Sequence, residues 1–330
     1  MIAKKNAENF PVERADLIRV VVKKIYINAA DVMTFELTSE TEKFLPRPEP
    51  GAHIDVYIRP GLIRQYSLCN GPLDESAYEI SVKREVGGRG GSIAMHDLRE
   101  GDKLLISSPR NGFPLNLGKR RKLLLAGGIG VTPLISMARH LENLEIPFEL
   151  HYFTRSPECT AYYKYCTDEN RKEKIYINHF NNTAEQSVYL DHILKKMQDC
   201  DLYLCGPPAF MEGILELASD WPKEQIHFEY FTQNVRAGEK DERAFTVTLV
   251  RKGLNFLVPP DKTIVEVLKE NGIFVEVSCE QGICGTCLTR VVGGAPDHRD
   301  QFQTEAERIT NKQITVCCSR ALSDSLLIDM

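Results

Sequence analysis

The sequence predicts a three-part protein of the multidomain β and α/β class. We expect an antiparallel β-barrel over residues 1–116, a doubly wound domain with a parallel sheet over residues 117–231, a linker over residues 232–242 and a β-grasp domain over residues 243–330. Short strand-like segments separated by turn residues predict the barrel, and alternating strand-like and helix-like segments predict the parallel sheet. A hairpin, a capped helix and further strands predict the β-grasp domain. A chain of 330 residues also exceeds one ordinary hydrophobic core.

The composition narrows the kinds of partner that the protein can have. The net charge of −5 gives no electrostatic support to nucleic-acid binding. No apolar run approaches the roughly 20 residues of a membrane span, and the first nine residues lack the apolar core of a signal peptide. Ten cysteines in a chain of this length do not make a disulfide framework. We therefore expect a cytoplasmic protein with no nucleic-acid and no membrane partner.

Two motifs in the first third suggest an anion site. The expected strands are 17–27, 33–37, 53–58, 64–68, 78–82 and 104–107. On the fourth strand Arg64 and Tyr66 share one face, and Gln65 and Ser67 share the other. A glycine-rich segment, residues 87–91, then leads through Ser92 into a helix, and such a turn lets the backbone approach an anion. Together the motifs predict a phosphate site; taken singly, each also fits a half-exposed strand or a flexible turn.

The middle third predicts a nucleotide-binding sheet. The buried strand 122–126 runs into the glycine turn 127–130, and Thr132 is the expected N-cap of a helix with Pro133 at its first position. This arrangement presents backbone N–H groups to a pyrophosphate, although a plain tight turn also fits. The alternation continues with strands 148–153, 175–178 and 201–205 and helices 161–166, 188–197 and 207–218. Gly206 and Pro207 follow a strand, at the edge where ligands bind in such sheets.

The last third contains a run of cysteines. Around it we expect the hairpin 245–251 and 255–258, a capping box at Thr263 that opens a helix, the strand 288–292, a second capping box at Thr304, and the strand 326–328. Four cysteines have the spacing of plant-type ferredoxins, which hold a [2Fe–2S] cluster: Cys279, Cys284, Cys287 and Cys317. Gly282 and Gly285 allow the loop to curl and point N–H groups at the sulfurs. A zinc site and free buried thiols are the alternatives.

The three parts together resemble a known family. In domain order and motifs the chain resembles the phthalate dioxygenase reductase family, flavin reductases that supply Rieske-type oxygenases. The resemblance covers nearly the whole chain. The motifs that carry it are residues 64–70, 88–92, 126–133, 205–207, 227–231, 279–287 and 317–321.

The resemblance implies FMN, NADH and a [2Fe–2S] cluster as cofactors, and a Rieske-type oxygenase as the protein partner. Arg64 and Ser92 take the position of phosphate ligands, Tyr66 and Ser67 that of residues lining the isoalloxazine, and Phe231 that of its cover. The remaining residues assigned to FMN are Gln65, Val82, Lys83, Gly90 and Gly91. The cluster ligands are Cys279, Cys284, Cys287 and Cys317, with Cys318 spare.

For NADH, the resemblance implies that Thr132 and Cys205 flank the nicotinamide. With Ser67 and Phe231 they are the candidates for the catalytic positions. The other residues assigned to NADH are Gly127, Gly128, Gly130, Pro133, Thr154, Arg155, Gly206 and Pro207. Arg155 could also bind a 2′-phosphate, but the resemblance favours NADH over NADPH.

The expected path runs from NADH through FMN and the cluster to the oxygenase, one electron at a time. Hydride transfer requires no acid–base side chain, so we expect no catalyst among His53, His96, His140 and His151. One alternative is an enzyme that runs the path backwards, a ferredoxin–NAD(P) oxidoreductase, or a stand-alone flavin reductase. Another is a non-enzymatic iron–sulfur protein that senses redox state.

Overall fold

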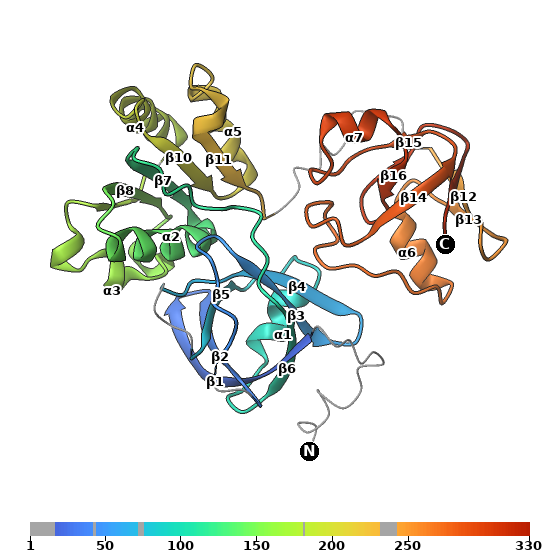
Figure 1. The fold of residues 1–330 in the computed structure, drawn as a ribbon, viewed down its shortest axis with the longest axis horizontal. Coiled ribbons are helices and arrows are strands. Elements are labelled where there is room, and N and C mark those ends of the chain that lie inside the picture. The colour runs from blue at the N-terminus through green and yellow to red at the C-terminus, as the bar shows by residue number, and fades with distance from the viewer. Residues whose placement is uncertain (1–16, 42–43, 72–75, 181, 232–242) are drawn as a thin grey trace. The chain divides into compact units, whose positions relative to one another are not determined.

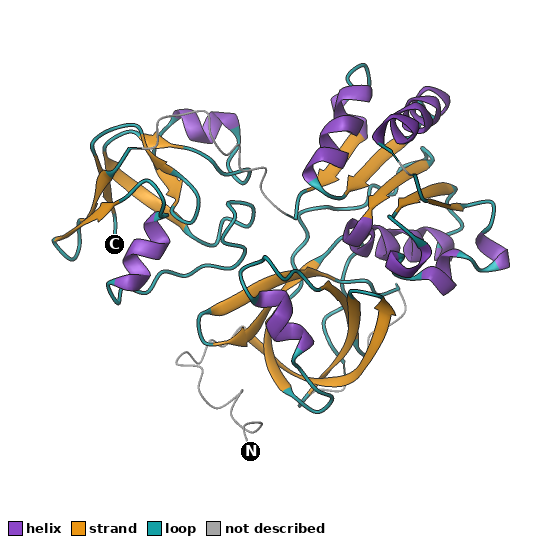
Figure 2. Cartoon of the chain, turned by 180° about the vertical axis from the view of Figure 1, so that it is seen from behind, coloured by secondary structure: helices purple, strands orange, loops and turns teal. Residues whose placement is uncertain are grey.

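The computed structural model describes residues 17–41, 44–71, 76–180, 182–231 and 243–330. The chain divides into two compact units, residues 1–231 and 232–330, which we describe separately (Figure 1). Figure 2 shows that helices are few beside the barrel strands and numerous around the parallel sheet. The predicted linker, 232–242, lies outside the described residues. Within the described residues, no helix has both the length and the apolar character that a membrane crossing requires.

The first part of unit 1 is an antiparallel barrel of six strands. They are β1 (Leu17–Ala29), β2 (Val32–Ser39), β3 (His53–Arg59), β4 (Leu62–Ser67), β5 (Tyr78–Lys83) and β6 (Lys103–Ser107). Their order is β4-β3-β6-β1-β2-β5, and a bridge between Leu68 and Ile80 joins the two edges. Alternation along β5 sends Tyr78, Ile80 and Val82 into the barrel core. Glu79 and Ser81, on the opposite face of β5, point away from that core.

A short helix, α1 (Gly91–His96), follows β5 and begins where the glycine-rich segment ends. Its N-cap is Gly90, whose φ of 76° lies in the left-handed region that favours glycine. The predicted glycine turn and the helix after it are thus both present. They lie beside β4, which carries Arg64.

The second part of unit 1 is a doubly wound sheet of five parallel strands. Its elements are β7 (Lys122–Gly127), α2 (Val131–Asn143), β8 (Phe148–Phe153), α3 (Tyr163–Cys166), β9 (Ile175–Asn178), α4 (Thr183–Lys196), β10 (Asp201–Cys205), α5 (Pro208–Leu217) and β11 (Ile226–Glu229). The strand order is β11-β10-β7-β8-β9, so the winding reverses between β7 and β10. Side chains of α2 and α3 cover one face of the sheet, and those of α4 and α5 cover the other. Such a reversal opens the crevice where ligands bind in doubly wound sheets.

One predicted cap in this domain is wrong. A short 3-10 turn (Gly128–Gly130) precedes α2, which begins at Val131, so its N-cap is Gly130 and not Thr132. The Thr132 hydroxyl donates to the carbonyl of Ile129 at 3.0 Å instead of accepting from a helix amide. The turn continues directly into the helix: the N–H of Val131 donates to the carbonyls of Gly128 and Ile129, so a backbone turn takes the place of a side-chain cap.

Unit 2 is a β-grasp domain with its own core. Its elements are β12 (Phe245–Leu249), β13 (Leu254–Val258), α6 (Ile264–Glu270), β14 (Leu288–Gly293), β15 (Pro296–Asp297), α7 (Glu305–Ile309), β16 (Gln313–Thr315), β17 (Arg320–Ala321) and β18 (Ser325–Ile328). The main sheet has the order β13-β12-β18-β14-β16, with β12 parallel to β18. Capping boxes at Thr263 and Thr304 start α6 and α7. Ile264 and Leu268 of α6 pack into the core of this sheet.

Candidate functional site

The structure brings the two predicted anion-binding motifs into contact. Arg64 on β4 donates to the carbonyl of Arg89 at 2.9 Å, which holds its guanidinium beside the glycine-rich segment. A Cβ added to Gly91 would lie 2.5 Å from Arg64 Cγ, so only glycine leaves room for this approach. The Ser92 hydroxyl accepts from the backbone N–H of Glu85 at 3.0 Å. A guanidinium, a hydroxyl and a glycine-lined turn therefore meet in one corner, a donor set that suits a phosphate.

The other residues predicted for the flavin lie on strands next to this corner. Across the β3–β4 pair, Ser67 faces His53 and Tyr66 faces Ile54, so Ser67 and Tyr66 project to opposite sides. Val82 ends the buried part of β5, and its carbonyl is 2.8 Å from Nε2 of His96 in α1.

Two of these predicted flavin residues have polar partners. Lys83, the last residue of β5, pairs with Glu85 at 2.6 Å. The Gln65 amide nitrogen is 3.4 Å from Nε2 of His53.

The glycines predicted for the nucleotide lie where the sheet reverses its winding. A Cβ on Gly130 would be 2.3 Å from the carbonyl oxygen of Cys205, and a Cβ on Gly206 would be 3.1 Å from Cα of Gly127. The ends of β7 and β10 therefore approach each other closely through bare backbone. A Cβ on Gly127 would also meet Pro207 Cδ at 2.9 Å. These contacts bring five predicted residues to the carboxyl edge of the sheet, with the amides of the glycine turn beside them.

Five further predicted residues lie at or near this edge. Thr132 and Pro133 are buried in the first turn of α2. Thr154 follows β8, and its hydroxyl lies 2.7 Å from Oγ1 of Thr160 and 3.0 Å from Nδ1 of His179. Arg155 is exposed beside it. Phe231 packs partly buried against the core that contains Cys205.

A buried carboxylate beside this edge was missed at the sequence level. Glu229 ends β11 directly opposite Cys205 of β10, and burial raises its pKa to about 8. Its Oε1 is 3.8 Å from Nδ1 of His53, and its Oε2 has no hydrogen-bond partner among the described residues. The only sequence signal was an acidic residue between aromatic ones in residues 227–231. Its position next to a predicted catalytic residue makes it a candidate for the site.

The cysteine loop of unit 2 is folded around the sulfur of Cys279. Its Sγ accepts hydrogen bonds from the backbone N–H groups of Gln281, Ile283 and Cys284 at 3.3–3.4 Å. Gly282 and Gly285 have φ values of 70° and 71°, which L side chains rarely adopt. Amides directed at a sulfur stabilise a thiolate, as cluster ligation requires.

Both glycines of this loop are also sterically required. A Cβ on Gly282 would lie 2.4 Å from Cys318 Sγ and 2.9 Å from Cα of Asp300. A Cβ on Gly285 would lie 2.4 Å from the ring of Phe302. Asp300 and Phe302 therefore form the wall that shapes the loop, and the sequence pattern did not reveal them.

The four predicted ligands form two pairs. Cys279 is hydrogen-bonded to Cys284, and Cys317 to Cys287 as well as to its neighbour Cys318. The bond from Cys279 lowers the pKa of the Cys284 thiol. In the described part of the chain no three Cys, His, Asp or Glu side chains are grouped so that they could hold a single metal ion. Two pairs of thiols are the donor set that two bridged irons need, so these residues fit a [2Fe–2S] cluster.

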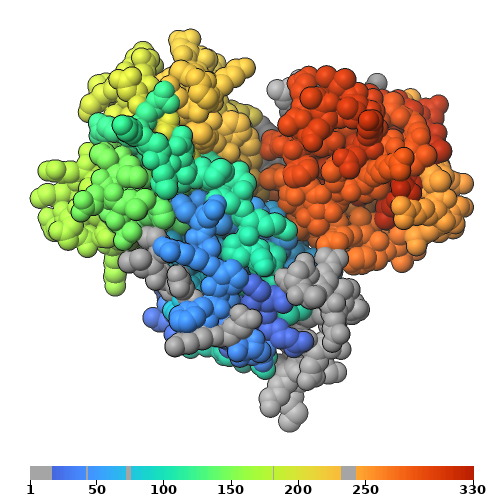
Figure 3. All heavy atoms as spheres, viewed as in Figure 1, coloured from blue at the N-terminus to red at the C-terminus, as the bar shows by residue number. Residues whose placement is uncertain are grey.

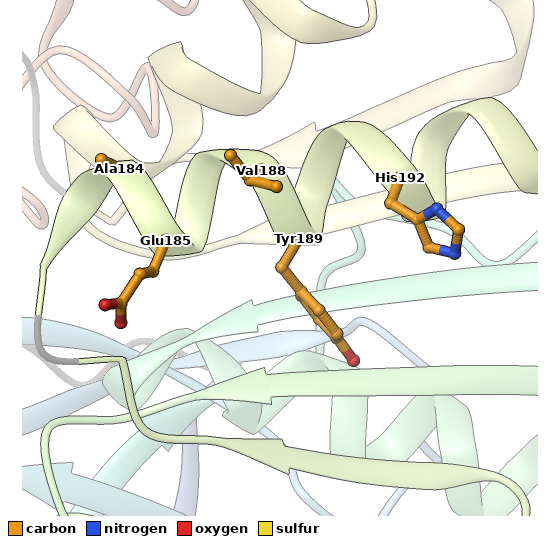
Figure 4. A pocket seen from close by; sticks show the side chains of 5 residues that line it. All are labelled: Ala184, Glu185, Val188, Tyr189 and His192. Atoms are coloured by element: carbon orange, nitrogen blue, oxygen red, sulfur yellow. The ribbon is translucent and has the colours of Figure 1, made fainter.

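One open groove lies apart from all these residues. Ala184, Glu185, Val188, Tyr189 and His192 of α4 line it, and Figure 4 shows Tyr189 pointing from the helix toward the sheet. The Tyr189 hydroxyl is 2.9 Å from Nδ1 of His151. No predicted site residue lines this groove, so we assign the site to the sheet edge and the barrel instead.

Comparisons with known proteins agree with this geometry. The family described as "2Fe-2S iron-sulfur cluster binding domain" matches residues 247–322. Vanillate O-demethylase oxidoreductase of Acinetobacter baylyi is 42% identical over 94% of this chain and 98% of its own length. Phthalate dioxygenase reductase of Burkholderia cepacia is 39% identical over 92% and 94%, respectively.

A solved structure of phthalate dioxygenase reductase, described as modular for electron transfer from pyridine nucleotides to [2Fe–2S], is 37% identical. It matches 96% of this chain and 98% of its own, with a TM-score of 0.78. The chain belongs to the phthalate dioxygenase reductase family. It is therefore an NADH-dependent oxidoreductase with FMN and a [2Fe–2S] cluster, and the reductase component of an oxygenase system. The predicted family, fold class, enzyme class and cofactors are thus confirmed.

Proposed function

We propose that this member of the family supplies a Rieske-type oxygenase with electrons from NADH, one at a time, through the residues predicted from the sequence. The observation that carries the proposal is the cysteine loop, which offers two pairs of thiols in a chain that also has a nucleotide-binding sheet. When bound, NADH supplies a hydride, FMN accepts it and releases single electrons, and the cluster carries one electron. The protein residues bind and orient these groups.

On the flavin side, Arg64 and Ser92 bind the phosphate of FMN from the corner that they share with Gly90 and Gly91. The guanidinium supplies a fork of charged donors, and the turn leaves no side chain in the way. Tyr66 lies on the same face of β4 as Arg64 and lines the ring of the flavin from there. Ser67 points to the other face and contacts the ring where the strand ends. The remaining flavin residues are Gln65, Val82 and Lys83, with Phe231 as the cover.

On the nucleotide side, the glycine turn 127–130 binds the pyrophosphate and Thr132 and Cys205 flank the nicotinamide. Gly130 approaches Cys205 closely, so the glycine turn and Cys205 share one end of the crevice. Pro133, Gly206 and Pro207 shape that end, and Thr154 and Arg155 contact the adenosine side. The family membership favours NADH over NADPH, and Arg155 is the one cationic residue in this set that could instead bind a 2′-phosphate.

In unit 2, the pair Cys279 and Cys284 and the pair Cys287 and Cys317 would hold the two irons of the cluster. The three amides that donate to the sulfur of Cys279 would stabilise it as a thiolate ligand when the cluster is bound. Phe302 lies on Gly285 and is 46% exposed, so little protein separates this loop from solvent.

Partner reduction tests the proposal. Purified protein should contain FMN and two irons per chain, and NADH should reduce it. It should then pass electrons to the oxygenase component of vanillate demethylase or phthalate dioxygenase faster than to a cytochrome P450. A solved intact type IV self-sufficient cytochrome P450 monooxygenase is 30% identical over 97% of this chain and 43% of its own, with a TM-score of 0.74. If the P450 is reduced faster, the partner is a P450 and not a Rieske-type oxygenase. The proposed path from NADH through FMN to the cluster would still stand.

The flavin assignment has its own test in Arg64→Ala. Loss of a charge-assisted contact is expected to cost about 1.5–3 kcal/mol, or roughly tenfold or more in FMN affinity. Flavin retention, followed by fluorescence during dialysis, measures it. Arg99→Ala is the control, because Arg99 lies in an exposed turn after α1. Unchanged retention in Arg64→Ala would remove Arg64 from the phosphate site.

A further inference from the structure

A buried polar cluster joins the barrel to the nucleotide-binding domain. Glu79 and Ser81 project from the outer face of β5, and Arg139 and Tyr162 meet them from the other domain. Nη1 of Arg139 is 2.9 Å from Oε1 of Glu79. The Tyr162 hydroxyl is 2.6 Å from Oγ of Ser81 and 3.2 Å from Oε1 of Glu79. We call these four residues the junction cluster. In Figure 3, the blue atoms of the barrel lie directly against the green atoms of the nucleotide-binding domain.

The junction cluster is part of a longer set of polar contacts between the two domains. Arg139 also donates to the carbonyl of Cys69. The Ser136 hydroxyl donates to the carbonyl of Asn70 at 3.0 Å, and the backbone N–H of Tyr162 donates to Oδ1 of Asn28 at 2.6 Å. Side chains of each domain are thus hydrogen-bonded to backbone groups of the other. Such contacts fix position more tightly than apolar packing, because hydrogen bonds depend on distance and angle.

These contacts lie close along the chain to both reacting sites. Cys69 follows Ser67, the last residue of β4, by two residues. Arg139 lies on α2, seven residues after Thr132, which is about 10 Å along the helix. A short backbone segment therefore connects the junction cluster to the proposed flavin site, and one rigid helix connects it to the proposed nicotinamide site.

We propose that Arg139 is a positioning residue, which sets the spacing between flavin and nicotinamide by holding Glu79 and the carbonyl of Cys69. The inference rests on the proposed placement of FMN beside Ser67 and of nicotinamide beside Thr132. Hydride transfer needs reacting atoms about 3–3.5 Å apart, and a displacement of about 1 Å can slow it about 10²-fold. Removing one partner of a largely buried ion pair leaves the other without compensation, so the contacts between the domains must rearrange.

The chain provides a matched control. Arg171 Nε is 2.8 Å from Oε1 of Glu142, and this pair lies wholly inside the nucleotide-binding domain. The side chain of Arg171 is 24% exposed and that of Arg139 23%. Both guanidinium groups lie over the ring of Tyr165, at 4.1 and 5.4 Å. The two ion pairs are thus alike in exposure, and only that of Arg139 crosses to the barrel; the second partner of Arg171, Asp168 at 3.2 Å, also lies in the nucleotide-binding domain.

Rapid mixing of NADH with the oxidised, FMN-loaded full-length protein tests the inference. The wild-type flavin should bleach, which checks the proposed function independently of any variant. In Arg139→Met the rate constant of flavin reduction should fall about 10- to 100-fold, whereas the dissociation constant of NADH should change less than about threefold. Arg139→Lys should recover part of the rate, because it restores a cation opposite Glu79. Arg171→Met should stay within about twofold of the wild type.

A second readout separates positioning from general instability. NADH deuterated at the transferred position should show an undiminished isotope effect in Arg139→Met, because hydride transfer itself becomes slower. A loss confined to NADH affinity, a vanishing isotope effect or an equal loss in Arg171→Met would overturn the inference. If Arg139→Met does not retain FMN, Glu79→Gln decides by the same measurements. Failure of NADH to reduce the wild-type flavin would instead contradict the proposed function.

Discussion

The adjacent thiols of Cys317 and Cys318 have different surroundings. Cys317 is buried in the core of unit 2 and hydrogen-bonded to Cys287. The sulfur of Cys318 lies against Gly282 and 3.3 Å from the hydroxyl of Thr315. The ligand assignment therefore depends on which of two neighbouring side chains turns toward Cys287.

Single serine variants test this assignment. Cys279→Ser, Cys284→Ser, Cys287→Ser and Cys317→Ser should each lose or weaken the cluster, because an iron then lacks one of its two thiolates. Cys318→Ser should retain it and is the matched control. Iron content and visible absorption give the result. A protein bleached by Cys318→Ser alone would make Cys318 the fourth ligand.

Glu229 gives the protein a pH-dependent stability. Burial raises its pKa from the ordinary 4.5 to about 8, so the folded state binds its proton more tightly than the unfolded state does. The protonated carboxyl therefore adds to the free energy of unfolding. This contribution is fully present below about pH 4.5 and is lost as the pH rises toward 8, by at most about 1.4 kcal/mol per pH unit. His53 lies 3.8 Å away, and burial together with Arg110 lowers its pKa.

Glu229→Gln tests this dependence, because an amide of the same size cannot titrate. Between pH 5.5 and 8.5 the wild-type melting temperature should fall more steeply than that of the variant, as measured by differential scanning calorimetry at matched FMN loading. Glu212→Gln, an exposed change on α5, is the control. Parallel curves for wild type and Glu229→Gln would show that Glu229 is already ionised in the folded protein.

At the scale of elements, the sequence predicted most strands because their signals are local. Alternating β-branched residues and flanking turn residues located the six barrel strands, and Thr263 located the start of α6 through its capping box. Two errors remained: a local cap was overlooked in one, and a neighbouring strand decides the other. Helix α4 begins at Thr183, not near Val188, because Asn182 caps it. No strand was predicted at β11, whose four residues gain their partner only from β10.

Contacts between distant segments explain what the sequence could not show at the site. The family motifs suggested only that Arg64 acts with Ser92, and Thr132 with Cys205. The close approaches of Arg64 to Gly91 and of Gly130 to Cys205 are visible only in the fold. Glu229 was missed because its burial comes from elements that no local pattern connects to it.

Two glycines provide a test at the scale of elements. Gly130→Ala places a Cβ 2.3 Å from the backbone carbonyl oxygen of Cys205, and neither atom can rotate away, so the ends of β7 and β10 must separate. We expect kcat/KM for NADH to fall at least about tenfold while the iron content is unchanged. Gly213→Ala in the exposed part of α5 meets nothing within 4 Å and should stabilise the protein by about 0.5–1 kcal/mol. Wild-type activity in Gly130→Ala would show that this contact does not shape the nucleotide site.

At the scale of the whole molecule, the two units have separate cores and separate tasks. Unit 1 contains the barrel core and both cores of the parallel sheet, and the junction cluster connects its domains. Unit 2 has a complete five-stranded sheet and its own core around Val247 and Leu326. The proposed hydride transfer therefore takes place in unit 1, and the proposed transfer of single electrons to the partner takes place from unit 2. Each unit should fold without its neighbour.

Truncation after Phe231 separates the two steps. Unit 1 alone should bind FMN and reduce ferricyanide with NADH at a rate close to that of the full chain, because a small acceptor can take electrons from the flavin directly. It should reduce cytochrome c or the oxygenase at least about tenfold more slowly, since the exit through Cys279, Cys284, Cys287 and Cys317 is gone. The full chain with Cys284→Ser is the matched control, because it keeps the polypeptide and loses the cluster. If truncation abolishes ferricyanide reduction while FMN stays bound, the cluster is not downstream of the flavin. If the truncated protein reduces the oxygenase at the full rate, the electrons leave from the flavin and unit 2 is not their exit.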